Sequence, residues 1–267
     1  STRSQRRVFC FGSTVTSLYV IDADGKNMRC LSGGPVNEMA PSLMHDGRVV
    51  YTRWEYVDKG FGNVQSLWAM RPDGSGSAHV YKNDVILPAG MIDARSIPGS
   101  QRIVAIGGPH GGKSVGPVIL VDNRRSKRNA KAMTNVTPEI AHPRMLQLYR
   151  HNPGLFRQPY PLSEKLFLVS HDPNVKGYGH YGIYLLDAWG NRVKVYQDPK
   201  QSCFQPIPLR PRRKPPVIPP VSQPGRTEEA NTATMFMQDI YQGMTGIERG
   251  RVKYVRVMQV MPTTWEE

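Results

Sequence analysis

One stretch of the sequence has the residue spacing of a phosphate-binding loop. Residues 107–114 satisfy the pattern GxxxxGK[ST], in which backbone amides surround phosphate groups and Lys113 would reach the terminal ones. Such a loop requires a helix that begins at the lysine. Here Pro117 follows almost at once and an apolar segment begins at Val118, so we interpret the stretch as a loop that joins two strands.

A second polar stretch has side chains that bind metals in other proteins. His171, Asp172 and His180 offer two imidazoles and a carboxylate, but their spacing matches no zinc signature, and we interpret them as turn-forming residues. For nucleophilic catalysis, the sequence contains no GxSxG and no serine or cysteine with a recognisable partner. The sequence therefore gives no catalytic residues.

The segment from Ala141 to Pro161 is long for a connection within one repeat. Connections of this length in compact domains are usually functional, and we interpret this one as a cap over one face of the fold. A shorter segment, residues 54–61, is rich in aromatic side chains and is a candidate surface for a glycan or a peptide. The candidate binding-surface residues from the two segments are Trp54, Tyr56, Phe61 and Phe156.

Internal repetition is the strongest signal in the chain. Four apolar segments each end in a polar turn: 18–25, 67–74, 118–123 and 183–190. Another apolar strand precedes each of them, at 8–11, 49–51, 103–106 and 167–169, and a weaker strand follows, at 28–31, 78–81, 131–134 and 193–197. The pattern predicts an all-β protein of antiparallel meanders that repeat about every fifty residues, the size of a propeller blade.

The repeat resembles a known family. The run Pro41-Ser-Leu, Asp46-Gly-Arg-Val-Val-Tyr51 and Leu67-Trp-Ala-Met-Arg-Pro-Asp-Gly74 is similar to TolB-like (WD40-like, PD40) propeller repeats. The resemblance implies a β-propeller of four-stranded blades. About four blades fall in this chain, and the family expectation is six. Either blades precede Ser1, which we favour, or residues 203–209 supply an inner strand to the blade that begins at Val8.

A longer run is similar to the middle region of hydrazine synthase alpha subunits and related proteins of unassigned function. It comprises residues 160–170, 182–191, 203–211, 215–219, 241–243 and 246–254. The resemblance implies an exported, periplasmic, multidomain protein whose propeller lies between two other domains. It also implies that Tyr160 or Tyr149 contacts a haem, and that His142 and His151 are the candidate ligands of a metal such as zinc, shared with a flanking domain.

The haem chemistry of that family is not carried over to this chain. Its flanking domains hold c-type haems through CxxCH motifs, whereas the three cysteines here, at positions 10, 30 and 203, form no such motif. We expect no cofactor in this chain itself, and we interpret the cysteines as buried thiols. The expected function is a non-catalytic scaffold, with a haem-oxidoreductase accessory domain and a glycan- or peptide-binding propeller as alternatives.

Composition sets the remaining expectations. The blades should occupy residues 1–205. A Pro/Arg-rich linker or strap should occupy residues 206–230, and a C-terminal extension should occupy residues 231–267, with a strand expected over 252–260.

The net charge of +14 falls mostly in loops without interleaved aromatic residues, so we do not expect nucleic-acid binding. No apolar run is long enough to span a membrane, and the partners expected are flanking domains or another protein.

Overall fold

A computed structural model describes residues 15–32, 34, 36–55, 65–110, 114–144, 155–173, 179–221, 235 and 237–258. In this part of the chain the regular structure is β-strand, apart from a single turn of 3-10 helix, η2 (Ala130–Ala132). The expected all-β class is therefore confirmed. No helix among these residues is both long and apolar enough to cross a membrane.

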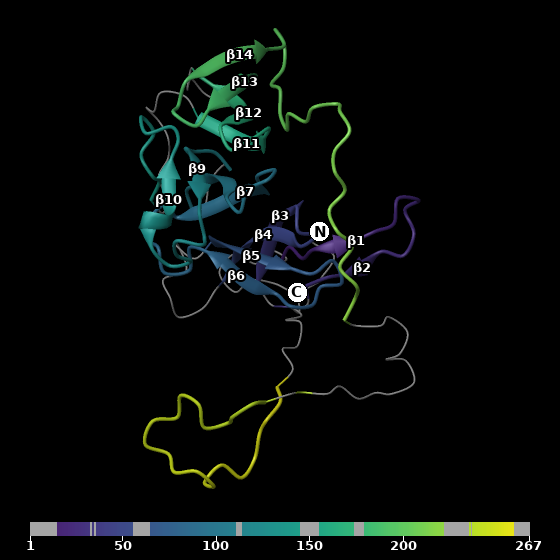
Figure 1. Cartoon of the computed structure of the whole chain (residues 1–267), viewed down its shortest axis with the longest axis vertical. Coiled ribbons are helices and arrows are strands. Elements are labelled where there is room, and N and C mark those ends of the chain that lie inside the picture. The colour runs from purple at the N-terminus through teal and green to yellow at the C-terminus, as the bar shows by residue number, and fades with distance from the viewer. Residues whose placement is uncertain are drawn as a thin grey trace, which may run out of the picture.

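The strands form a repeating antiparallel meander (Figure 1). We call the hairpin β1 (Tyr19–Val20) and β2 (Arg29–Cys30) the first unit. The second unit is β3 (Asn37–Leu43), β4 (Val49–Trp54), β5 (Gln65–Met70) and β6 (Ala78–Tyr81). The third is β7 (Gly90–Ser96), β8 (Ile103–Gly108), β9 (Val118–Val121) and β10 (Met133–Asn135). The fourth is β11 (Leu155–Pro161), β12 (Leu166–Asp172), β13 (Gly182–Asp187) and β14 (Arg192–Tyr196).

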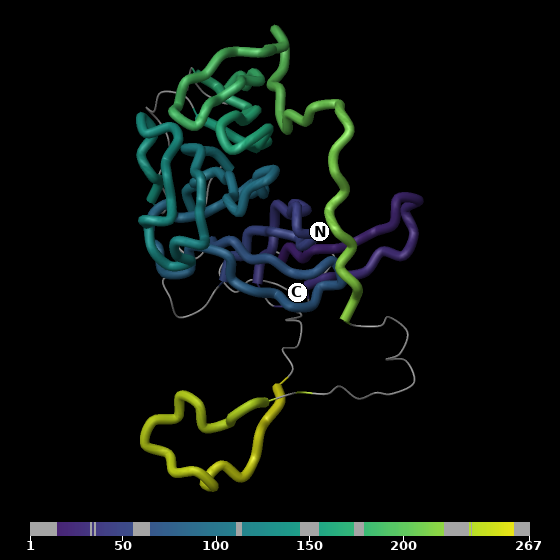
Figure 2. The backbone as a smooth tube through the Cα atoms, viewed as in Figure 1, coloured from purple at the N-terminus to yellow at the C-terminus, as the bar shows by residue number. Residues whose placement is uncertain are grey.

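Hydrogen bonding is dense within a unit and sparse between units. Every strand of a unit pairs antiparallel with the next one in sequence. The second and third units join into one eight-stranded sheet through a single parallel pair, Gln65 with Gly90. Figure 2 shows the chain passing from unit to unit along a curve. Cohesion between units therefore depends on side chains.

Alternating side chains place the hydrophobic cores between consecutive units. In β8, Ile103 and Ala105 face the second unit, whereas Val104 and Ile106 face the fourth. Each middle sheet is thus apolar on both faces, as a sheet covered on both sides must be. Counting described residues alone, the core between the third and fourth units is the largest, and the core between the first and second has Leu18, Tyr51 and Met70 as its buried members.

A second contact between neighbouring units recurs at the turn that follows the third strand. A Cβ on Gly74 would collide with the carbonyl oxygen of Leu31 in the preceding unit, and one on Gly190 would lie 2.8 Å from the carbonyl oxygen of Val136. Both glycines also have positive φ angles, of 89° and 94°. The third unit lacks the glycine and instead has the Lys82 amide donating to the Lys127 carbonyl. These turns need glycine both for conformation and for close approach.

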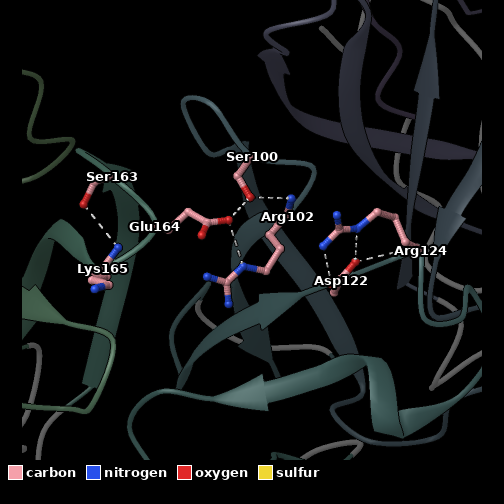
Figure 3. A network of polar contacts seen from close by, with 7 residues as sticks. All are labelled: Ser100, Arg102, Asp122, Arg124, Ser163, Glu164 and Lys165. Carbon is pink, nitrogen blue, oxygen red and sulfur yellow. Dashed lines mark hydrogen bonds and ion pairs between the residues drawn. The ribbon is translucent and has the colours of Figure 1, made fainter.

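Polar contacts reinforce the junction between the third and fourth units (Figure 3). Ser100 Oγ donates to Glu164, and Arg102 Nε lies 3.3 Å from the same carboxylate. Nearby, Asp122 accepts from the guanidinium of Arg124, which keeps the β9–β10 turn closed. The Ser100 hydrogen bond, followed by Arg102, holds the pKa of Glu164 below its usual range.

The segment expected as a proline-rich linker or strap, 206–230, has no strands assigned in its described part, and we call residues 210–221 the strap. Its amide at Val221 donates to Asp73 Oδ2 at 2.7 Å, and a Cβ on Gly47 would collide with the Pro216 carbonyl oxygen. Figure 1 shows the strap passing from the fourth unit towards the first and second. The strand expected over 252–260 is not formed at 252–258, where no neighbouring strand pairs with it, and 259–260 lie outside the described residues.

Candidate functional site

The second strands end and the third strands begin at the same end of the units, and Trp54 and His110 lie there. Their ring centroids are 4.9 Å apart in an edge-on arrangement, and Gln65 Nε2 lies 2.9 Å from His110 Nδ1. Burial lowers the pKa of His110. Because Trp54 and Gln65 belong to the second unit and His110 follows β8, this cluster ties two units together. Trp54 is half-buried, and Tyr56 and Phe61 lie outside the described residues.

The glycine-rich stretch at 107–114 lies at this end as well. Gly107 and Gly108 complete β8, the Gly107 amide donates to the Pro117 carbonyl at 3.0 Å, and β9 begins at Val118. The stretch therefore joins two strands, as the sequence predicted, and no helix begins within its described part. Lys113 lies outside the described residues.

His171 occupies an aromatic site inside the fourth unit. Its ring stacks on Phe156 with centroids 4.1 Å apart and meets the ring of Tyr184 edge-on at 4.9 Å. Nδ1 donates to the Leu155 carbonyl at 3.2 Å, while Nε2 is buried without a hydrogen-bond partner in the described part of the chain. Desolvation lowers the pKa of His171 to about 4, so the ring is neutral at pH 7.

This packing corrects two expectations. Phe156 was expected on a binding surface, but its side chain is fully buried between His171 and the third unit, because the alternation of β11 turns it inwards. Cys30 was expected to be a buried thiol, but it is exposed at the edge of the two-stranded hairpin, and Cys203 is half-buried.

Asp172 and His180 form a local contact. Asp172 Oδ2 accepts from the His180 amide at 3.1 Å, and His180 Nε2 lies 3.2 Å from the Gln201 carbonyl oxygen. These contacts hold the chain at the start of β13. Within the described ranges, no group of three histidine, cysteine, aspartate or glutamate side chains converges as metal ligands would.

The structure separates two of the residues that the family resemblance implicates. His142 precedes Pro143, whose carbonyl accepts from Ala89 at the start of β7. Tyr160 instead lies under the guanidinium of Arg95, six residues further along. The two residues therefore lie beside opposite ends of β7. Tyr149 and His151 lie outside the described residues.

His142 itself has a feature that a ligand would have. Its Nδ1 is buried and lacks a hydrogen-bond partner among the described residues, and burial lowers its pKa, which favours the neutral ring that metals bind. Tyr160 is 8% exposed and has a cation over its ring, so its environment is that of a packed residue. Of the two, only His142 fits a shared metal site.

Sequence reasoning missed two polar clusters on the inner strands. Asp93, at a positive φ of 53°, has a pKa raised by desolvation and partly restored by Arg157, and its Oδ2 has no hydrogen-bond partner in the described part. On β3 and β4, the Arg53 guanidinium lies over the Trp68 ring at 4.5 Å and 3.8 Å from Glu38. Neither cluster has a sequence motif. The isolated acidic residue Asp93 in an apolar segment is the one sequence feature that could have indicated a buried polar group.

A buried lysine was also missed. Lys82 is 0% exposed, follows β6 with a φ of 97°, and desolvation lowers its pKa to about 7. Its amide makes the contact to the third unit described above. Like His110 and the Arg102 network, it lies where two units meet, so the unusual polar groups of this chain mainly mark unit junctions.

Of three comparisons with known proteins, the one with solved structures gave matches. No family model matches the chain, and no curated protein matches it. Among solved structures, it is similar to Kuenenia stuttgartiensis hydrazine synthase, with 21% identity and a TM-score of 0.50 over 70% of this chain. The chain spans 23% of the length of that neighbour. The likeness is one of all-β fold.

Proposed function

We propose that the chain is most of a β-propeller built from TolB-like blades, and that it acts as a non-catalytic scaffold in a larger exported protein. The single observation that carries the proposal is that the hydrophobic cores formed by the described residues all lie between consecutive units. Blades of a propeller pack face to face in this way. The loops between second and third strands then gather at one end, where a flanking domain or a partner protein would dock.

The polar chemistry supports a scaffold. His171 is locked in an aromatic stack, Asp172 holds a backbone amide, and the Arg102–Glu164 contact joins two units. Their positions are explained by packing, so no substrate is needed to account for them.

The test is the cofactor content of the whole gene product, purified from a host that matures haem. For a scaffold, replacing the polar residues of this chain changes neither the haem, measured as the pyridine haemochrome, nor the zinc per protein. A loss of haem or zinc on His142→Ala, with the Asp93→Asn control unchanged, would contradict the scaffold proposal.

A second function is favoured by the unpartnered Nδ1 of His142. In this alternative the chain is an accessory domain of a haem oxidoreductase and supplies His142 to a zinc or haem site that a flanking domain completes. Haem or zinc would there supply redox or Lewis-acid chemistry, and this chain would supply only a neutral imidazole. Loss of one equivalent of metal in His142→Ala, but not in His180→Ala, is the expected result.

A further inference from the structure

The start of β5, of β9 and of β1, which matches them in the repeat, makes the same lateral contact with the next unit. Thr16, just before β1, accepts from the Glu38 amide of β3. Gln65, the first residue of β5, pairs with Gly90 of β7. Gly116, just before β9, exchanges two hydrogen bonds with Phe156 of β11. The partner in every case is the first strand of the following unit.

The segment Cys203–Leu209 makes this contact with the fourth unit. Tyr181, which directly precedes β13, accepts from the Cys203 amide at 2.8 Å. The Tyr181 amide donates in turn to Ser202 Oγ. The segment therefore holds the position that β3, β7 and β11 hold beside the units before them.

Backbone conformation gives an independent match. Each first strand has one non-glycine residue of positive φ inside a bulge: Ala40 at 50°, Asp93 at 53° and Gln158 at 50°. Gln205 has a φ of 52°, and its amide donates to Gln158 Oε1 at 3.0 Å. Such angles are uncommon outside glycine, so four of them at matching positions are unlikely to be independent.

The sequence repeats as well. Residues 158–162 read Gln-Pro-Tyr-Pro-Leu and residues 205–209 read Gln-Pro-Ile-Pro-Leu. The matched residues differ in environment, because Tyr160 is 8% exposed and Ile207 is 53% exposed. The residue on the first strand of the fourth unit is covered, whereas its counterpart in Cys203–Leu209 is exposed.

We propose that Cys203–Leu209 is the first strand of a fifth unit, whose other three strands are a further meander of the same polypeptide that packs on the outer face of β12–β14. The inference rests on the proposed propeller scaffold. It identifies the surface on which the next unit packs, and it identifies the packing element as a further antiparallel meander.

The outer face of β12–β14 has the composition of a covered face. Leu168, Leu185 and Val193 lie side by side across the three strands, and Ile183 pairs with Tyr196 in the next row. Val193 and Tyr196 are 60% and 57% exposed. The side chains on the corresponding face of the third unit are buried by the fourth unit: Val104, Ile106, Val118 and Leu120.

The residues that directly follow Leu209 do not supply the missing strands. Up to Val221 they continue as the strap, which contacts Gly47 and Asp73 of the second unit. In each described junction the occupant of the face is the next repeat of the same polypeptide. We therefore assign the occupant to the same polypeptide and not to a second molecule.

The experiment measures the alkylation rate of Val193→Cys in the whole gene product, read by mass spectrometry of the peptide, with light scattering to fix the oligomeric state. We expect at least about tenfold slower modification in the monomer than at Lys200→Cys, an exposed control on the following loop. Equal rates would show an open face and overturn the proposal. Protection that appears only with rising protein concentration would assign the face to a second copy, which also overturns it.

A second pair of variants tests the strand itself. Ile207→Asp should lower the melting temperature of the whole gene product by about 5 °C or more, because it places a charge where a fifth core would form. Val217→Asp, on the strap at 92% exposure, should leave it unchanged. Equal effects would contradict the assignment. Haem and metal content, which test the proposed function, are separate readouts and do not depend on either result.

Discussion

The junction between the third and fourth units differs sharply from the junction between the first and second. The former buries a continuous cluster that includes Phe156, Phe167 and Tyr184, and adds the Glu164 contacts at its rim. Among the described residues, the latter buries three apolar side chains, with Leu31, Val49 and Trp68 only partly covered. The described parts of two junctions built from one repeat therefore differ in how many apolar side chains they bury between sheets.

The largest effect that would test this comparison is a cavity in the stronger junction. Phe167→Ala removes a fully buried ring from that cluster and should cost about 3–5 kcal/mol of unfolding free energy. Leu18→Ala in the weaker junction is the matched change and should cost less, about 2 kcal/mol, since its partly covered neighbours can close in. Urea denaturation measures both. Equal losses would mean that the junctions are equivalent.

Acid should weaken the stronger junction through His171. Its folded pKa of about 4 lies below the ordinary value of 6.5, so between these values the unfolded chain binds a proton that the folded chain does not. Stability therefore falls as the pH falls from 6.5 towards 4, by about 2 kcal/mol between pH 7 and pH 5.

The corresponding variant is His171→Phe, which keeps the ring on Phe156 and removes the titrating group. Urea midpoints at pH 7 and pH 5 should differ less in this variant than in the wild type. His45→Gln controls for the loss of an exposed histidine. An undiminished acid sensitivity in His171→Phe would assign the effect to other groups.

The turn contact between units is the next effect in size. Gly190→Ala should cost about 2 kcal/mol, because the new Cβ would crowd the Val136 carbonyl oxygen and the φ of 94° is strained for alanine. Gly99→Ala also has a positive φ, of 69°, but no atom lies within 4 Å of the new Cβ. Thermal unfolding should show a smaller loss at Gly99. If the two losses are alike, strain alone and not the neighbouring unit requires the glycine.

The smallest effect should come from the exposed ion pair. Glu164→Gln removes the charge that Arg102 faces at the rim of the stronger junction, and solvent screens most of that interaction. Its effect on thermal stability should be the least of the four and should vanish at about 1 M salt. A loss as large as that of Gly190→Ala would show that the network, and not the apolar cluster, makes this junction strong.

The sequence located some strands far better than others. The second and third strands of the described units were found at their observed places because they are apolar and uninterrupted, as at β4, β8, β9 and β13. The third strands β9 and β13 are also followed by Asp-containing turns, whereas the second strand expected at 8–11 lies outside the described residues. The first strands were not located, since a bulge with Pro41 or Pro159, or the charged Asp93, breaks the alternation of each.

The candidate site was less predictable. Sequence spacing correctly excluded a helix after the glycine-rich stretch, but it placed Phe156 on the surface. It also could not foresee that Tyr160 and His142 lie at opposite ends of a unit, because both fall in one irregular segment of the sequence. The clusters around Asp93 and Arg53 depend on contacts between strands that are distant in sequence.

The strap has a mechanical consequence. Gln205 is held at β11 and Pro216 at the turn after β3, so the chain between them, roughly eleven residues, spans at most about 40 Å when fully extended. Prolines make this stretch stiff and leave it little slack. Any bending that moves the second unit away from the fourth is thus limited by a tether of fixed length, which bears the load before the sheets separate.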